Sequence, residues 1–163
     1  MKKIITYSAI LCISLIACNQ KQASDANIAK YEKNLEIAKQ FYAAFTSKDS
    51  TKQATFLTDD FKWNGPAIGQ DSLSKEVLLA GDKEFMKAFN DIKFENTEYV
   101  PGLDPKTYAL DGGVRVYGTI NSKFASSGKT SKVKYYAVLG FNDSGKITTL
   151  EEYYNMEDLS KEF

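Results

Sequence analysis

The apolar and polar positions divide the chain into four parts. After Lys2 and Lys3, residues 4–17 form a nearly continuous apolar stretch, and residues 19–27 are polar without a large apolar side chain. Farther along, apolar side chains first recur every three or four residues, as on a helix, and beyond Ile92 every second residue, as on a strand. The pattern predicts a leader, a polar connector, a helical region and a sheet region, in that order.

The two folded regions can be divided into elements. Helical spacing predicts helices at residues 28–47, at 51–57, and from 71 or 72 to 92. Alternation predicts strands at residues 93–100, 114–124, 132–141 and 146–155, separated by a loop at 101–105 and turns at 125–130 and 142–145. Because the helices precede long antiparallel strands, we expect an α+β fold with the helices on one face of a curved sheet.

Strand 132–141 shows which side chains should face inward. Lys132 and Lys134 share one parity and should face solvent. The inward set is then Val133, Tyr135, Ala137, Leu139 and Phe141. Tyr135 would either bring a hydroxyl into an apolar cavity, where it could orient a ligand, or reach the rim or a backbone carbonyl.

Composition excludes several kinds of chemistry. The 163 residues include no histidine, two cysteines and one arginine. Without histidine there is no Ser-His-Asp or Cys-His catalysis and no His-ligated metal, and two cysteines are too few for a Cys-rich zinc site or a disulfide framework. The 21 basic and 21 acidic side chains cancel, which leaves no electrostatic footprint for nucleic acid. We expect no metal, no cofactor and no nucleic-acid partner.

The leader is typical of an exported protein. Its apolar stretch is too short to span a membrane as a helix but suits the hydrophobic region of a signal peptide. It ends in Leu15-Ile16-Ala17-Cys18, which resembles the bacterial lipobox. That resemblance implies cleavage before Cys18 and lipidation of Cys18 with fatty acyl chains such as palmitate. An ordinary signal peptide that contains a cysteine, or an uncleaved anchor, remains the alternative.

These assignments divide the chain into three segments. Residues 1–17 are the expected lipoprotein signal peptide, residues 18–27 the lipidated cysteine with a flexible tether, and residues 28–163 one domain. The expected location is the bacterial cell envelope, at the periplasmic face or the cell surface, with the membrane as a partner through the lipid.

The domain resembles the SnoaL-like branch of the nuclear-transport-factor-2-like superfamily. The resemblance covers about residues 34–160 and is carried by the order of four short motifs. These motifs are DDFKWNGP at 59–66, KVKYYAVLGF at 132–141, NDSGKI at 142–147 and EEYYN at 151–155. It implies a cone-shaped fold in which a curved mixed or antiparallel sheet wraps three N-terminal helices around a pocket, and a homodimer formed through the sheet. Relatives include isomerases, epoxide hydrolases, dehydratases, cyclases and proteins without known activity, so the fold does not determine the function.

The resemblance also suggests which residues line the pocket. The expected ligand-pocket residues are Tyr42, Trp63, Tyr135, Leu139, Tyr153 and Asn155. Trp63 would lie near the mouth of the cone or simply pack in the core. Asn155 stands where the closing strand of relatives commonly carries an acid, and an amide cannot titrate.

Without histidine, the candidates for acid–base catalysis are Asp59, Asp60, Glu151, Glu152 or a tyrosine. Asp59 and Asp60 lie next to a predicted helix end, where carboxylates are more often surface or capping groups. The weak candidates that remain are Glu151 and Glu152.

Because Glu151 and Glu152 are adjacent on a strand, one should face inward and the other outward. Without a stronger catalytic constellation, we first expect a protein that binds a small hydrophobic or aromatic ligand. A carboxylate- and Tyr-dependent isomerase, hydratase or cyclase is the alternative, and a pocketless interaction module is the third. A cavity-facing Glu151 or Glu152 within hydrogen-bond reach of Tyr135 or Trp63 would favour the enzyme.

Overall fold

The computed structural model describes residues 25–162. The elements in chain order are an N-terminal helix (residues 25–46), α2 (Ser50–Ala54), β1 (Leu57–Asn64), β2 (Leu73–Ser74), α3 (Lys75–Ala88), β3 (Phe89–Leu103), β4 (Leu110–Phe124), β5 (Thr130–Phe141), β6 (Ile147–Tyr153) and the 3-10 helix η1 (Met156–Ser160). The expected signal peptide, Cys18 and the tether up to residue 24 lie outside the described residues. Residues 25–27, which we assigned to the tether, are helical. Among the described residues, no helix is both long and apolar enough to cross a membrane.

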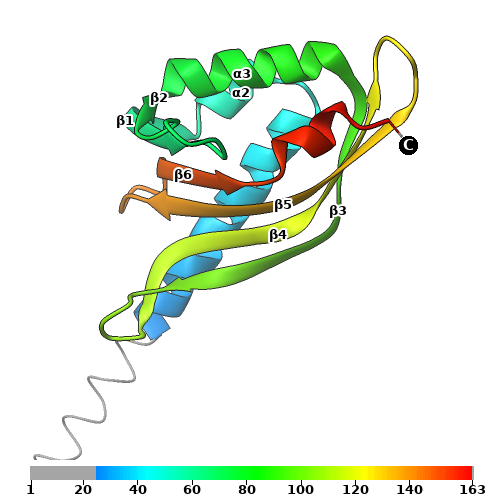
Figure 1. The fold of residues 1–163 in the computed structure, drawn as a ribbon. Coiled ribbons are helices and arrows are strands. Elements are labelled where there is room, and N and C mark those ends of the chain that lie inside the picture. Colours follow the sequence, from blue (N-terminus) through cyan, green and yellow to red (C-terminus); the bar gives the residue numbers. More distant parts are fainter. Residues whose placement is uncertain (1–24, 163) are drawn as a thin grey trace, which may run out of the picture.

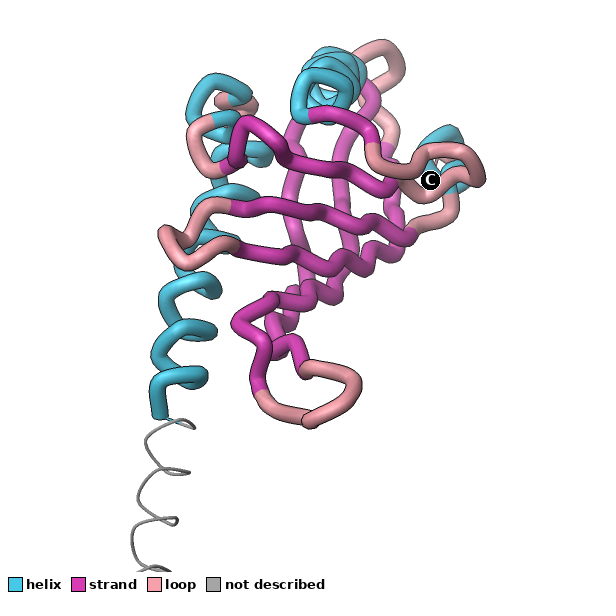
Figure 2. The backbone as a smooth tube through the Cα atoms, turned by 90° about the vertical axis from the view of Figure 1, so that its left-hand side faces the viewer, coloured by secondary structure: helices cyan, strands magenta, loops and turns pink. Residues whose placement is uncertain are grey.

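The strands form one mixed sheet in the order β2-β1-β6-β5-β4-β3. β1 and β6 run parallel, and all other neighbours are antiparallel. The long strands bend, and the helices gather on one side of the sheet, as Figures 1 and 2 show from two directions. The prediction of an α+β cone with helices first is therefore confirmed.

The core lies between the helices and the inner face of the sheet. Along β5 the buried side chains occupy alternate positions that include Val133, Tyr135 and Leu139, as the alternation predicted. On the helix side, Phe41 and Phe45 belong to the same buried cluster. Burial of these apolar faces is the main force that holds the N-terminal helix against the sheet.

The end of the third helix differs from the sequence-based prediction. The third helix ends at Ala88 and the chain continues directly as β3, although Phe89 and Ile92 keep the helical spacing. A register shift between Asn90 and Lys93 places an irregularity there, with Asp91 at φ 52°. Phe89 and Ile92 are three positions apart, so a regular strand would place them on opposite faces. The bulge brings both to the same buried face.

The other differences concern where strands begin and end. Leu57, predicted as the end of the second helix, is the first residue of β1. β3 continues through Pro101 into the predicted loop, which is tolerated because β3 is an edge strand of the sheet. β4 begins at Leu110, four residues before the prediction.

Candidate functional site

A cavity of about 350 Å³ lies inside the cone. Most of its lining is aliphatic or aromatic, including Phe41, Phe45, Leu78, Phe85, Ile120 and Leu150. A few polar side chains reach the same space: Tyr42, Gln53, Trp63, Asp82, Tyr135, Glu152 and Tyr154. An apolar cavity with a few converging polar groups is the usual form of a small-molecule site.

Glu152 is the centre of the first polar cluster. Tyr135 donates its hydroxyl to Glu152 Oε1 at 2.6 Å, and the indole Nε1 of Trp63 donates to Oε2 at 2.8 Å. The hydroxyls of Tyr42 and Tyr135 lie 3.0 Å apart. Because the Tyr135 proton is directed to Glu152, Tyr42 is the donor of this bond. Elements far apart in the sequence therefore meet at one carboxylate.

The surroundings of Glu152 adjust its proton affinity. Burial raises the pKa of Glu152, and the hydrogen bonds from Tyr135 and Trp63 oppose that rise because they favour the ionised form. Burial and the nearby Glu152 charge also raise the pKa of Tyr135 and Tyr42 well above the ordinary value, so both remain hydrogen-bond donors. Glu152 is thus an ionisable base with a higher proton affinity than a surface glutamate.

Asp82 of α3 is a second carboxyl group in the cavity. Its oxygen Oδ2 accepts a hydrogen bond from Gln53 Nε2 at 2.6 Å. Burial and the charge of Glu152 raise the pKa of Asp82 to about 8, although the bond from Gln53 lowers it. At neutral pH Asp82 is mostly protonated. The cavity therefore contains a group that can give a proton and another that can take one, the arrangement that general acid–base chemistry requires.

The cavity opens along α3. Gly81, Glu84 and Ala88 line it and are also exposed to solvent. Leu159 of η1 lines the same cavity, so the tail after β6 contributes to its wall. A ligand can therefore reach the carboxylates from the side of the molecule where α3 and η1 approach the cavity.

The structure brings Tyr42, Trp63 and Tyr135 together on the cavity lining, with their polar atoms joined directly or through Glu152. Of the two adjacent glutamates, Glu152 faces the cavity. Glu151 instead accepts a hydrogen bond from the hydroxyl of Tyr153 at 3.0 Å.

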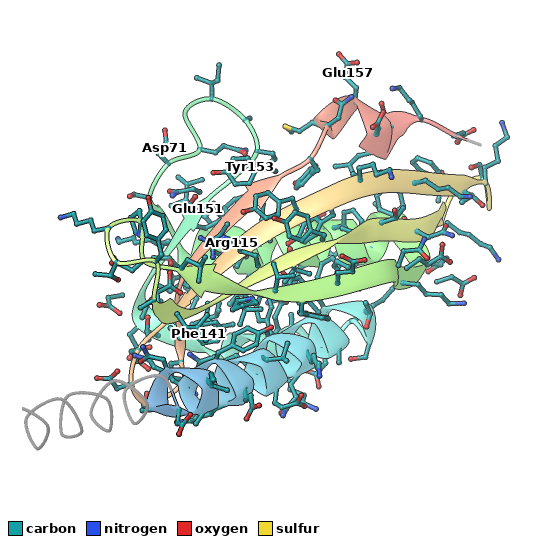
Figure 3. All side chains as sticks on the ribbon, turned by 90° about the horizontal axis from the view of Figure 1, so that it is seen from below. Asp71, Arg115, Phe141, Glu151, Tyr153 and Glu157 are labelled. Atoms are coloured by element: carbon teal, nitrogen blue, oxygen red, sulfur yellow. The ribbon has the colours of Figure 1, made fainter. Side chains whose placement is uncertain are left out.

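Three expected pocket residues lie elsewhere. Leu139 is fully buried in the core and does not line the cavity. Tyr153 is on the outer face of the sheet with Glu151, where Figure 3 shows both on the side away from the N-terminal helix. Asn155 is exposed, and its side chain accepts from Glu157 N at the start of η1. Tyr153 and Asn155 share one cause: Leu150, Glu152 and Tyr154 are the inward residues near the end of β6, so Tyr153 and Asn155 have the wrong parity. Leu139 does face inward, as predicted, but it packs in the core away from the cavity.

Sequence reasoning missed Gln53, Asp82 and Tyr154. Asp82 had a detectable signal, because it lies four residues after Leu78 and three before Phe85, on the apolar stripe of its helix. A charged residue on such a stripe points toward the core. Gln53 is in a helix of five residues without apolar periodicity, so its position depends on the tertiary fold.

The described residues contain no group of three or more acidic side chains that could hold a metal ion. Glu152 and Asp82 are instead joined to neutral donors, Tyr135 and Trp63 at Glu152 and Gln53 at Asp82.

Comparison with known proteins places the fold in a family. A sequence model of the SnoaL-like domain matches residues 38–150, while no curated protein sequence matches the chain. Similar solved structures include a candidate isomerase from Bacillus subtilis, with 16% identity and a TM-score of 0.65, covering 79% of this chain and 91% of that one. A candidate polyketide cyclase from Xanthomonas campestris has 15% identity and a TM-score of 0.65, covering 80% and 97%.

A third similar structure is the epoxide hydrolase/cyclase-like enzyme SalBIII, with a role in pyran ring formation in the polyether salinomycin. It has 17% identity and a TM-score of 0.63, covering 78% of this chain and 94% of that one. Likeness at this level of identity shows a shared fold. The family model, which matches most of the domain, shows that the chain belongs to the SnoaL-like domain family.

Proposed function

We propose that the protein is an acid–base enzyme that moves protons on a small, mainly apolar substrate, in a reaction of the isomerase, hydratase or cyclase type. The observation that carries the proposal is the position of Glu152 on the cavity, bonded to both Tyr135 and Trp63. In this scheme Glu152 takes a proton from the substrate and Asp82 returns one. The apolar lining limits water at the reacting atoms, which strengthens the electrostatic interactions of Glu152 and Asp82 with the substrate.

The proposal replaces our first expectation of ligand binding without strong catalysis. That expectation depended on Asn155 as the residue in the place of an acid, and Asn155 is exposed outside the cavity. The isomerase and cyclase names belong to proteins that share the fold, and for this chain the proposal depends on its own carboxyl groups.

Glu151 and Glu152 provide a matched pair of variants for the test. A suitable probe is 5-nitrobenzisoxazole, whose ring opens when a base removes its ring proton and the N–O bond breaks. We expect the wild-type protein to accelerate this opening above the buffer rate, and Glu152→Gln to lose about a hundred-fold or more of that acceleration. Glu151→Gln should retain it, because Glu151 faces away from the cavity. A wild-type rate equal to that of Glu152→Gln would reject Glu152 as a base and restore the simple binding protein.

We also propose that the protein is held in the bacterial cell envelope by a lipid on Cys18. The support is the sequence of residues 2–18, with a basic start, a short apolar stretch and a cysteine after Leu-Ile-Ala.

A homodimer formed through the outer face of the sheet is a separate proposal. Its support is a row of stacked tyrosines across three strands of this face. Tyr117 and Tyr136 have ring centroids 4.6 Å apart, and Tyr136 and Tyr153 have centroids 5.4 Å apart. Tyr117 and Tyr153 are 43% and 53% exposed, a large aromatic surface for a monomer to leave in water.

A further inference from the structure

Gln53 has hydrogen-bonding capacity that the protein does not use. Its side chain lines the cavity and the residue is only 1% exposed. Nε2 donates to Asp82, but Oε1 accepts no hydrogen bond from any of residues 25–162. A buried carbonyl oxygen without a partner is costly, and the cost is removed when a bound molecule donates to it.

Asp82 supplies the complementary group beside this acceptor. The bond from Gln53 occupies Oδ2, so the proton of the neutral acid can reside on Oδ1 and be donated to a ligand. The two side chains therefore present one acceptor and one donor next to each other. A hydroxyl is the smallest neutral group that satisfies both, because it donates one hydrogen bond and accepts another.

Glu152 is a weaker candidate for the same ligand group. Its oxygens Oε1 and Oε2 already accept hydrogen bonds from Tyr135 and Trp63. A hydroxyl bound there would have to share or replace those donors. At Gln53 it would meet an oxygen that no protein donor occupies.

We propose that Gln53 and Asp82 form a hydroxyl-binding subsite of the cavity, so that the substrates are small apolar compounds that carry an alcohol or phenol group. The inference rests on the proposed function, since it names the substrate class of the same cavity. A site built to hydrogen-bond a hydroxyl rejects an analogue that lacks it, because the buried polar groups are then left unpaired.

Three related probes separate the two hydrogen bonds. 2-Naphthol donates and accepts, 2-methoxynaphthalene only accepts, and 2-methylnaphthalene does neither. Binding to the full-length protein is measured by fluorescence titration near pH 6.5. We expect 2-naphthol to bind about ten- to a hundred-fold more tightly than its methyl ether, the range that one unpaired buried acceptor produces.

Gln53→Met retains the size of the side chain but removes the acceptor. It should bring the ratio of the 2-naphthol and ether affinities close to one and leave 2-methylnaphthalene binding unchanged. The matched control is Gln40→Met, at an exposed position of the N-terminal helix, which should behave as wild type. Asp82→Asn should retain the preference, because an amide can still donate to the ligand and accept from Gln53. Circular dichroism checks that each variant is folded.

The outcomes distinguish this inference from the proposed function. The subsite is overturned if the ratio of the 2-naphthol and methyl ether affinities persists in Gln53→Met. It is also overturned if the wild-type protein binds none of the three probes. A ratio that disappears in Glu152→Gln but persists in Gln53→Met places the hydroxyl at Glu152, which rejects the subsite and leaves acid–base catalysis standing. A ratio that depends on Gln53 in a protein that does not open 5-nitrobenzisoxazole supports the subsite and rejects the catalytic role.

Discussion

Trp63 of β1 and Glu152 of β6 are joined across two parallel strands, with the indole Nε1 2.8 Å from Oε2. The strand register places Trp63 beside Leu150, so the indole reaches two residues along β6 to the next side chain on the same face. Parallel pairing of β1 with β6 therefore gives the cavity carboxylate one of its two donors. The only tryptophan in the chain is thus a positioning group for the proposed base.

Replacing Trp63 by Phe should change the proton affinity of Glu152. The ring would still fill space, but the ionised carboxylate would lose a hydrogen bond that favours it, so the pKa of Glu152 should rise further. We expect the acidic limb of the pH–rate profile with 5-nitrobenzisoxazole to move to higher pH, and the free energy of unfolding to fall by about 1–3 kcal/mol. If Trp63 only packs, stability would fall and the limb would not move.

Asp82 should make stability depend on pH. Its pKa is about 8 in the folded protein, against an ordinary value of 3.8. Between these values the folded state binds more protons at this site than the unfolded state, so the free energy of unfolding falls as pH rises, by at most about 1.4 kcal/mol per pH unit. The contribution of Asp82 is complete below the ordinary pKa and is lost as pH rises through about 8.

Urea unfolding at several pH values between 5 and 8 measures this slope. Asp82→Asn cannot titrate and should show a flatter dependence than wild type. The raised pKa of Glu152 acts in the same direction and remains in the variant, so some slope should persist. Identical slopes for the two proteins would show that Asp82 is ionised throughout this range.

The inward-facing residues could be predicted from the sequence for β5 but not for the end of β6. On β5, lysines alternate with apolar side chains, so the inward residues could be assigned correctly from parity. At the end of β6 and just beyond it, Glu151, Glu152, Tyr153 and Tyr154 follow one another without alternation, and polarity could not distinguish the two faces. Only the packing of Leu150 against the core decides that Glu152 faces inward.

The helix-to-strand boundary and the second carboxyl show two other limits. Phe89 and Ile92 fit a helical stripe as well as they fit a strand with a bulge, so spacing alone could not place the end of α3. Asp82 could have been found as a charge on an apolar stripe. The contact between Asp82 and Gln53, 29 residues apart, depends on how α2 packs against α3.

Leu139 should matter for stability but not for ligand binding. Its side chain is 0% exposed in the core and is not part of the cavity wall. Leu139→Ala should lower the free energy of unfolding by about 2–5 kcal/mol, because it removes apolar contacts and leaves a void. Urea unfolding measures that loss. The affinity of the folded variant for 2-naphthol should equal that of wild type, and a large loss of affinity would show that Leu139 contacts the ligand.

The stacked tyrosines on the outer face predict an effect on oligomeric state. Tyr136 is the middle ring, so Tyr136→Ser removes both stacking contacts and should weaken a dimer formed through this face. Sedimentation velocity over a range of protein concentrations would show a shift toward monomer. Tyr108→Ser is the matched control, because Tyr108 is 77% exposed in the turn between β3 and β4. A wild-type protein that is monomeric at all concentrations would rule out the dimer.

The proposed lipid on Cys18 predicts that the protein is anchored to a membrane. If Cys18 is the lipidated first residue after cleavage, Cys18→Ser removes the acceptor of the lipid, and the variant should accumulate as an uncleaved precursor that carries no fatty acid. Labelling with radioactive palmitate, combined with membrane fractionation, measures both effects. Cys12→Ser is the matched control, since Cys12 lies within the expected signal peptide and should not affect labelling. Acyl chains anchor a protein because their methylene groups are buried in the membrane. A Cys18→Ser protein that was still acylated would carry its lipid at another residue, which would exclude Cys18 as the anchor.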